Sequence, residues 1–181
     1  MKIIRLITFL LMFFYVSIGN AKNMTIYDFS FKDIDGNNVK LEKFRGKPIF
    51  MVNTASRCGY TPQYENLQTL WSDYRSKGVV IIGAPTNNFK QEPGSNKEIK
   101  DFCETNFGID FPMTQKIDVI GNKAHPFYKW AKENHGIAAI PKWNFHKIII
   151  SKNGKVADTF ASFTKPTSKK FIKIIEREIK N

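Results

Sequence analysis

Apolar positions in the first half of the chain predict a strand, an amphipathic helix and a second strand. Lys47–Asn53 is a short apolar run, and Val79–Gly83 is apolar throughout, as expected for strands that helices cover on both faces. Between them, Pro62 suits the start of a helix and Gly78 its end. The apolar residues that fall at helical spacing in that interval are Tyr64, Leu67, Leu70, Trp71 and Tyr74.

Two further pairs of strands are predicted to form hairpins. The alternation of apolar and polar residues favours strands at 25–31 and 39–41 near the N-terminus, and two further strands are predicted at 146–151 and 155–160, on either side of a turn near the C-terminus. The first turn is predicted at Asp35-Gly36-Asn37-Asn38. The second contains Asn153-Gly154, a strong hairpin signal.

Three more helices complete the pattern. Ser95 is followed three residues later by Glu98, a capping box that opens a helix through about Asn106. Another helix is predicted from about Ala124 to Glu133. The C-terminal helix has an apolar face of Phe171, Ile172, Ile175 and Ile179. This order predicts an α/β domain with a thioredoxin-like fold, in which α-helices flank a central mixed β-sheet and a β-hairpin lies at the N-terminus.

The first 21 residues are typical of a signal peptide. Lys2 and Arg5 are basic, Ile7–Ile18 is almost unbroken apolar sequence, and Gly19-Asn20-Ala21 offers the small residues of a cleavage site. An uncleaved membrane anchor is the alternative, but about 20 apolar residues are needed to span a bilayer and this run is shorter. We therefore expect cleavage after Ala21, an exported protein that is periplasmic or secreted, and one mature domain over residues 22–181.

The chain is basic, with a formal charge of +12 that falls to +10 without Lys2 and Arg5. An excess of this size favours peripheral contact with anionic surfaces such as phospholipid headgroups. Nucleic acid is not an expected partner, because the lysines are spread along the chain rather than gathered in one patch interleaved with aromatic residues.

The chain has two cysteines, Cys58 and Cys103. In an exported protein two cysteines form either a structural disulfide or a redox pair, and a domain of this size does not need the former. Cys58 stands where an apolar strand gives way to an amphipathic helix. The unpaired N–H groups at a helix N-terminus favour the nucleophilic thiolate, and Arg57 adds positive charge beside it. Its placement indicates a reactive thiol.

Three sequence blocks carry a family resemblance. NTASRCGYTPQY at 53–64, NNFKQEPGSNKEIKDFC at 87–103 and KWNFHKIII at 142–150 resemble the signature blocks of the glutathione peroxidase family, in the same order. The likeness extends from about residue 25 to the C-terminus. It implies a cysteine-type peroxidase of the thioredoxin fold that reduces hydrogen peroxide and organic or lipid hydroperoxides and serves antioxidant defence.

The resemblance also implies which residues act. Cys58 matches the peroxidatic position, Gln91 matches the catalytic glutamine, and Trp143 and Asn144 match the other members of a catalytic tetrad. These three side chains are suited to donate hydrogen bonds to a leaving oxygen without titrating. One departure lies upstream of Gln91, where the family usually reads FPCNQF and residues 84–89 read APTNNF.

Cys103 has two interpretations. It shares a predicted helix face with Ile99 and Phe102, so it is most simply a small buried apolar residue. Its surroundings also resemble the segment that carries the resolving cysteine in the thioredoxin-dependent, two-cysteine branch of the family. That role implies a disulfide between Cys103 and oxidised Cys58.

Other functions remain as alternatives. A thiol-disulfide oxidoreductase of the same fold would normally carry Cys-x-x-Cys, whereas Thr61 stands at the second cysteine position. A non-enzymatic redox sensor needs only the two cysteines. A copper-delivery module would need two nearby thiols and a histidine, and no histidine has metal-ligand spacing with the cysteines. No cofactor and no metal are expected.

The reductant is left open by the resemblance. Family members that prefer glutathione tend to lack the resolving cysteine, so Cys103 favours a thioredoxin-like protein over glutathione as the thiol reductant. An exported protein would need a periplasmic dithiol donor. The segment Gly136–Pro141 is short compared with the assembly loop of tetrameric relatives, which predicts a monomer or at most a weak dimer.

Overall fold

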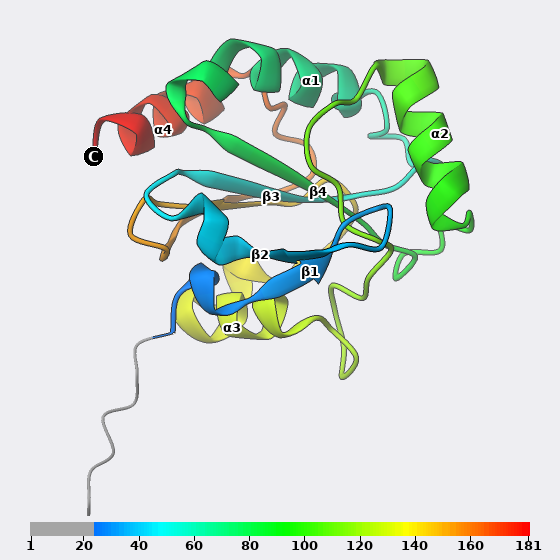
Figure 1. Cartoon of the computed structure of the whole chain (residues 1–181), viewed down its shortest axis with the longest axis horizontal. Coiled ribbons are helices and arrows are strands. Elements are labelled where there is room, and N and C mark those ends of the chain that lie inside the picture. Colours follow the sequence, from blue (N-terminus) through cyan, green and yellow to red (C-terminus); the bar gives the residue numbers. More distant parts are fainter. Residues whose placement is uncertain (1–23) are drawn as a thin grey trace, which may run out of the picture.

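The computed structural model describes residues 24–181 (Figure 1). The predicted signal peptide, residues 1–21, lies outside this range, so its cleavage stays a prediction. No helix within the described range is long and apolar enough to cross a bilayer.

A four-stranded mixed sheet forms the centre of the domain (Figure 1). Its strands, in spatial order, are β4 (Val80–Pro85), β3 (Ile49–Thr54), β5 (Lys147–Ile150) and β6 (Val156–Phe160). β3 and β4 are parallel and end together, with Thr54 opposite Pro85, whereas β5 runs antiparallel to β3 and to β6. All residues of β3, β4 and β5 are buried, which confirms the prediction made for β3 and β4 and extends it to β5.

Helices cover both faces of the sheet (Figure 1). One face carries α1 (Gln63–Tyr74) and α4 (Lys169–Lys180), and the other carries α3 (Pro126–His135) with the hairpin of β1 (Ser30–Lys32) and β2 (Asn38–Lys40). Successive residues of β3 point to opposite faces. Phe50 therefore joins the core under α1 and α4, and Met51 joins the core under α3. The predicted order of strands and helices is confirmed.

Helix α2 (Asn96–Phe107) follows β4 and lies beside the end of the sheet where β3 and β4 finish (Figure 1). The predicted capping box is confirmed: the Ser95 hydroxyl accepts from the Glu98 N–H, and the Glu98 carboxylate accepts from the Ser95 N–H at 2.7 Å. The helix ends at Gly108, whose φ of 60° is left-handed. Only Ile99 and Cys103 of this helix are fully buried.

The N-terminal hairpin is shorter than predicted. Residues 25–31 were expected to form one strand, but the first part is a 3-10 helix, η1 (Ile26–Asp28). The Thr25 N–H donates to the Asp28 carboxylate at 2.9 Å, and this local bond turns the chain. The other 3-10 helices are η2 (Leu41–Phe44), which takes up Leu41 from the predicted second strand, η3 (Arg75–Lys77) and η4 (Gly136–Ala139).

Helix α3 begins and ends two residues later than predicted. His125 has a non-helical backbone, with φ −52° and ψ 140°, and acts as the N-cap, because its Nδ1 accepts from the Phe127 N–H at 3.2 Å. Pro126 then takes the first helical position, where its missing N–H costs nothing. α1 ends at Tyr74, and η3 continues the turn as far as Gly78, whose φ of 87° stops it as predicted.

Candidate active site

Cys58 lies in the connection between β3 and α1. The carbonyls of Cys58, Tyr60 and Thr61 each accept a hydrogen bond from the N–H three residues later, at 2.9, 2.9 and 3.0 Å. This run of turns leads from Cys58 into α1, which itself begins at Gln63. The predicted position of Cys58 between strand and helix is confirmed, but the N–H that donates to the sulfur comes from Tyr60 and belongs to these turns, not to α1 itself.

The turn around Cys58 holds the sulfur in a fixed setting. Its side chain is 7% exposed, and Sγ accepts a hydrogen bond from the Tyr60 N–H at 3.4 Å. The Cys58 N–H donates to Thr61 Oγ1 at 3.0 Å, and that hydroxyl donates to the Ala55 carbonyl at 2.9 Å. Thr61 therefore closes the turn at the position where an oxidoreductase would have its second cysteine. Sequence reasoning noted only that Thr61 is not a cysteine.

A buried carboxylate fastens this turn to the loop after β4. Glu92 is almost fully buried, and its Oε2 accepts from the Ser56 N–H at 2.8 Å and from the Ser56 hydroxyl at 3.0 Å. Beside it, the Arg57 N–H donates to the Gln91 carbonyl at 3.0 Å. Burial raises the pKa of Glu92, and the bonds from Ser56 oppose that shift. Apart from the place of Glu92 in the second block, no sequence pattern indicates this role.

The structure brings the predicted donors Gln91, Trp143 and Asn144 together. Asn144 is fully buried, and its Nδ2 donates to Gln91 Oε1 at 2.9 Å. Trp143 is 41% exposed and packs against Phe89, with ring centroids 5.4 Å apart. Because Gln91 Oε1 is taken by Asn144, the NH₂ end of the Gln91 side chain is left to donate elsewhere. The cluster joins the Cys58 turn through the Arg57–Gln91 backbone bond.

Asn53, the penultimate residue of β3, holds residues 143–146 in place through hydrogen bonds. Its Nδ2 donates to the Trp143 carbonyl at 3.1 Å, its carbonyl accepts from the Phe145 N–H at 2.6 Å, and its Oδ1 accepts from the His146 N–H at 3.1 Å. Phe145 has a left-handed φ of 62°. In the described part of the chain only one other non-glycine residue has a positive φ, Lys90 at 58°. Each adjoins a predicted donor, and such strain is often found at active sites.

The loop that departs from the family pattern is well bonded. Thr86 is buried, and its hydroxyl donates to Asn88 Oδ1 at 3.0 Å. Asn87 Oδ1 accepts from the Glu92 N–H at 3.0 Å, and Asn88 Nδ2 donates to Asp118 at 2.7 Å. These contacts give the loop before Gln91 a defined shape with the residues that this chain has.

Cys103 is fully buried on α2, in the same apolar cluster as Cys58, and both thiols are free. Burial raises the pKa of the Cys103 thiol to about 11, although the neighbouring Tyr64 hydroxyl acts in the opposite direction. Cys103 is therefore a neutral thiol at physiological pH as long as α2 stays folded. The predicted face shared with Ile99 is confirmed, and Phe102 packs at its edge.

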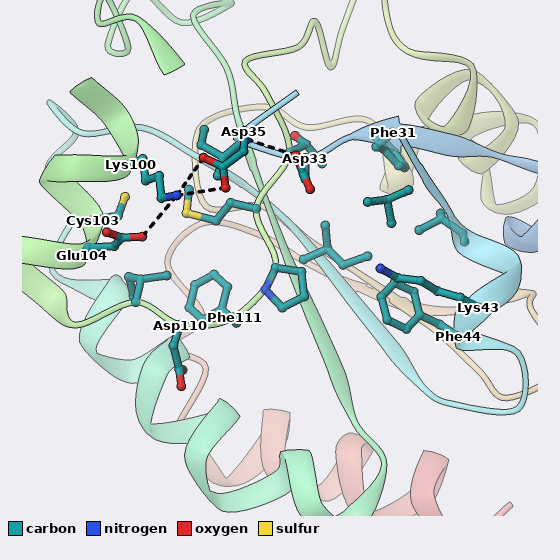
Figure 2. A pocket seen from close by; sticks show the side chains of 18 residues that line it. Phe31, Asp33, Asp35, Lys43, Phe44, Lys100, Cys103, Glu104, Asp110 and Phe111 are labelled. Atoms are coloured by element: carbon teal, nitrogen blue, oxygen red, sulfur yellow. Dashed lines mark hydrogen bonds and ion pairs between the residues drawn. The ribbon is translucent and has the colours of Figure 1, made fainter. Parts of the chain in front are cut away.

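A cavity of about 330 Å³ lies beneath α2. Figure 2 shows Lys100, Cys103 and Glu104 at one end of it, with Lys43 and Phe44 at the other. The Lys100 ammonium bridges to the Asp35 carboxylate at 2.7 Å, which ties α2 to the turn of the N-terminal hairpin. A second hollow of about 200 Å³ separates α2 from the Cys58 turn and is lined by Ser56, Arg57, Glu92, Ile99 and Phe102, among others. The buried residues of α2, Ile99 and Cys103, thus lie between the cavity and the hollow.

No group of three or more His, Cys, Asp or Glu side chains suited to a metal ion occurs among residues 24–181.

Comparisons with known proteins agree with this geometry. The family model described as glutathione peroxidase matches residues 26–132. The chain is 45% identical over 149 residues to the glutathione peroxidase-like peroxiredoxin 2 of Saccharomyces cerevisiae, covering 80% of this chain and 91% of the relative. It is 44% identical over 153 residues to the hydroperoxy fatty acid reductase gpx1 of Synechocystis, covering 80% and 90%. The crystal structure of Trgpx in apo form matches with a TM-score of 0.70 and 34% identity over 87% of this chain and 97% of that one, which confirms the predicted fold.

Proposed function

The chain belongs to the glutathione peroxidase family and is a thiol-dependent peroxidase, and we propose that Cys58 is the residue that attacks the peroxide. The observation that carries this proposal is the setting of Sγ. Sγ accepts a hydrogen bond from the Tyr60 N–H. The turn that contains both residues is joined to the Gln91–Asn144 pair, because the Arg57 N–H donates to the Gln91 carbonyl. A nucleophile and a set of neutral donors are thus held on adjoining loops.

The proposed reaction has three balanced steps. The Cys58 thiolate attacks one peroxide oxygen, the O–O bond breaks, and Cys58 becomes a sulfenic acid while the other oxygen leaves as an alkoxide or hydroxide that takes up a proton. The Cys103 thiol then displaces water from the sulfenic acid and forms a disulfide. A dithiol reductant reduces that disulfide by exchange and is itself oxidised. Gln91, Trp143 and Asn144 are assigned to stabilise the charge on the leaving oxygen.

The resolving step requires α2 to open. A disulfide needs Cα atoms within about 7 Å, and a buried thiol with a raised pKa is a poor partner until it is exposed. α2 buries only two of its own side chains fully and lies between the cavity and the hollow described above. Segments with few buried contacts open at low cost in free energy. These features support Cys103 as the resolving cysteine.

Removing any one of the three donors is expected to slow oxidation of Cys58. Gln91→Ala, Trp143→Phe and Asn144→Ala should each lower the rate by a factor on the order of 10 to 1000, the range for loss of a preorganised hydrogen-bond donor. Rapid quenching with a thiol-alkylating reagent, followed by mass analysis, measures this rate without relying on tryptophan fluorescence. Gln68→Ala is the control, because the Gln68 side chain binds Asp110 instead. Unchanged rates in all three variants would contradict the assignment.

We also propose that lipid hydroperoxides are substrates and that the active-site face contacts anionic membranes. The charge of the chain supports this, as do two exposed aromatic residues that lie near lysines in the sequence. Trp143 follows the exposed Lys142, and Phe163, 73% exposed, lies two residues before the exposed Lys165. The segment with Phe163 is bonded to the start of α1, since the Ser162 carbonyl accepts from Gln63 Nε2 at 2.6 Å.

A steady-state assay tests this substrate range. The protein should reduce hydrogen peroxide and also phospholipid hydroperoxide in anionic vesicles, and a thioredoxin-type donor should support faster turnover than glutathione. Phe163→Ser should slow the vesicle reaction several-fold and leave the reaction with hydrogen peroxide unchanged. Met24→Ser removes an exposed apolar side chain next to α3 on the opposite face and serves as the control. Activity confined to hydrogen peroxide would refute the lipid proposal alone.

Export to the periplasm or beyond the cell is likewise proposed, on the basic and apolar pattern of residues 1–21. The reductant would then be a periplasmic dithiol protein. A monomer is proposed because Gly136–Ala139 forms the compact η4 directly after α3, which leaves only a short segment before Trp143.

A further inference from the structure

Lys147 carries a buried ammonium group that the reaction above does not use. The residue is 0% exposed, yet Nζ donates only to neutral oxygens: Gln63 Oε1 at 2.6 Å, the Thr164 carbonyl at 2.7 Å and the Ser162 carbonyl at 3.3 Å. A buried charge without a carboxylate partner is costly even when all its hydrogen bonds are made. An apolar residue would fill a strand position at lower cost, so this lysine calls for a functional explanation.

The Lys147 cluster ties three segments together behind the Cys58 turn. Lys147 is the first residue of β5, Gln63 is the first residue of α1, and Ser162 and Thr164 follow β6. Gln63 takes part twice, because its Oε1 accepts from Lys147 and its Nε2 donates to the Ser162 carbonyl at 2.6 Å. The side chain of Gln63 is thereby fixed in one orientation at the start of the helix.

A series of hydrogen bonds connects this cluster to the sulfur of Cys58. The Gln63 N–H donates to the Tyr60 carbonyl at 2.9 Å, and the Tyr60 N–H donates to Cys58 Sγ at 3.4 Å. Fixing Gln63 therefore fixes the turn that presents an N–H to the sulfur. The series passes through the Gln63 side chain and the Tyr60 Cα, so it couples the cluster to the sulfur by position, and a positive charge behind the turn favours the thiolate.

We propose that Lys147 is a positioning residue for Cys58. Lys147 holds the start of α1 through Gln63, and its buried positive charge, behind the Cys58 turn, stabilises the thiolate. The proposal rests on Cys58 as the nucleophile. It assigns no contact between Lys147 and the peroxide.

The titratable groups on the elements around the turn are consistent with this role. Burial lowers the pKa of Lys147 to about 7, so the ammonium is charged below neutral pH. Burial, and secondly the charge of Lys147, lower the pKa of His146 to about 4, so this imidazole is neutral there. The ionisable groups next to the turn and the cluster include Arg57 and Tyr60 in the turn, Glu92 on the loop, Tyr64 on α1, Cys103 on α2 and Lys165 after β6. Of these, Arg57 and Lys165 are exposed and screened by solvent.

The test is the pH profile of Cys58 alkylation by iodoacetamide, measured by peptide mass analysis from about pH 5 to about pH 10. Lys147→Met, which keeps the length of the side chain without its charge, should slow alkylation below neutral pH, where the wild-type ammonium is charged. Alkylation near pH 6 should then be about tenfold slower, while the plateau at high pH stays within about twofold of wild type. Lys123→Met removes an exposed lysine and should leave the profile unchanged.

A second variant keeps the test decisive if Lys147→Met does not fold. Gln63→Met removes the bridge and leaves Lys147 bonded to Ser162 and Thr164, so its profile should shift in the same direction. Two results overturn the proposal. One is a folded variant whose alkylation rates match those of wild type at every pH, and the other is an alkylation rate lowered by the same factor at every pH. Because alkylation needs neither peroxide nor reductant, a shifted profile in a protein without peroxidase activity would support this role and refute only the proposed reaction.

Discussion

Cys58→Ser is expected to abolish peroxide reduction and to leave the fold intact. The serine hydroxyl is hardly ionised near neutral pH and is a poor nucleophile toward a peroxide, so activity should fall below about 1% of wild type. The fold should survive because a serine oxygen can still accept the hydrogen bond that the Tyr60 N–H gives to Sγ. The other hydrogen bonds of the turn, including the one from the Cys58 N–H to the Thr61 hydroxyl, do not depend on the sulfur.

A single-turnover experiment sharpens this comparison. One equivalent of hydrogen peroxide should be consumed by wild type and by Cys103→Ser, since both keep the proposed nucleophile, but not by Cys58→Ser. Thermal unfolding checks that all three proteins are folded. Activity of Cys58→Ser above about 1% of wild type would remove Cys58 from the nucleophile role.

The central strands and the main helices could be predicted because their signals are local. An apolar run such as Val79–Gly83 and a capping box such as Ser95 with Glu98 act within a few residues, and both are confirmed. The segment 25–31 misled the prediction because its alternation resembles a strand. The hydrogen bond from the Thr25 N–H to Asp28 and the one from the Ile26 N–H to the Gly154 carbonyl decide otherwise.

The supporting residues of the site could not be predicted, because their roles depend on partners far along the chain. Asn53 binds the segment 143–146, Glu92 binds Ser56, and Lys147 binds Gln63. Polar residues in an apolar strand, as Asn53 and Lys147 are, give a weak signal that something must satisfy them. Gln91, Trp143 and Asn144 were found earlier through the family resemblance, and neither spacing nor composition would have selected them.

Cys103→Ser is expected to abolish turnover with a thioredoxin-type donor. In wild type, one equivalent of peroxide should give a disulfide between Cys58 and Cys103. Intact-mass analysis should show this disulfide as the loss of two hydrogens, and circular dichroism should show a loss of helical signal from α2. Without Cys103 the sulfenic acid persists, so excess peroxide should carry Cys58 on to sulfinic acid. Glutathione, which can attack the sulfenic acid directly, should still support slow cycling.

Two controls separate the resolving role from a packing role. Cys103→Ala leaves the buried position apolar and should fail in turnover as Cys103→Ser does, whereas a packing role would make the alanine variant the milder one. Glu104→Ser changes the neighbouring exposed residue of α2 and should turn over normally. A stable gain of about 16 Da in oxidised wild type, with Cys103 still open to alkylation after unfolding, would mean that Cys58 stops at the sulfenic acid. Cys103 would then be a core residue of α2, and the cavity and hollow around that helix would need another explanation.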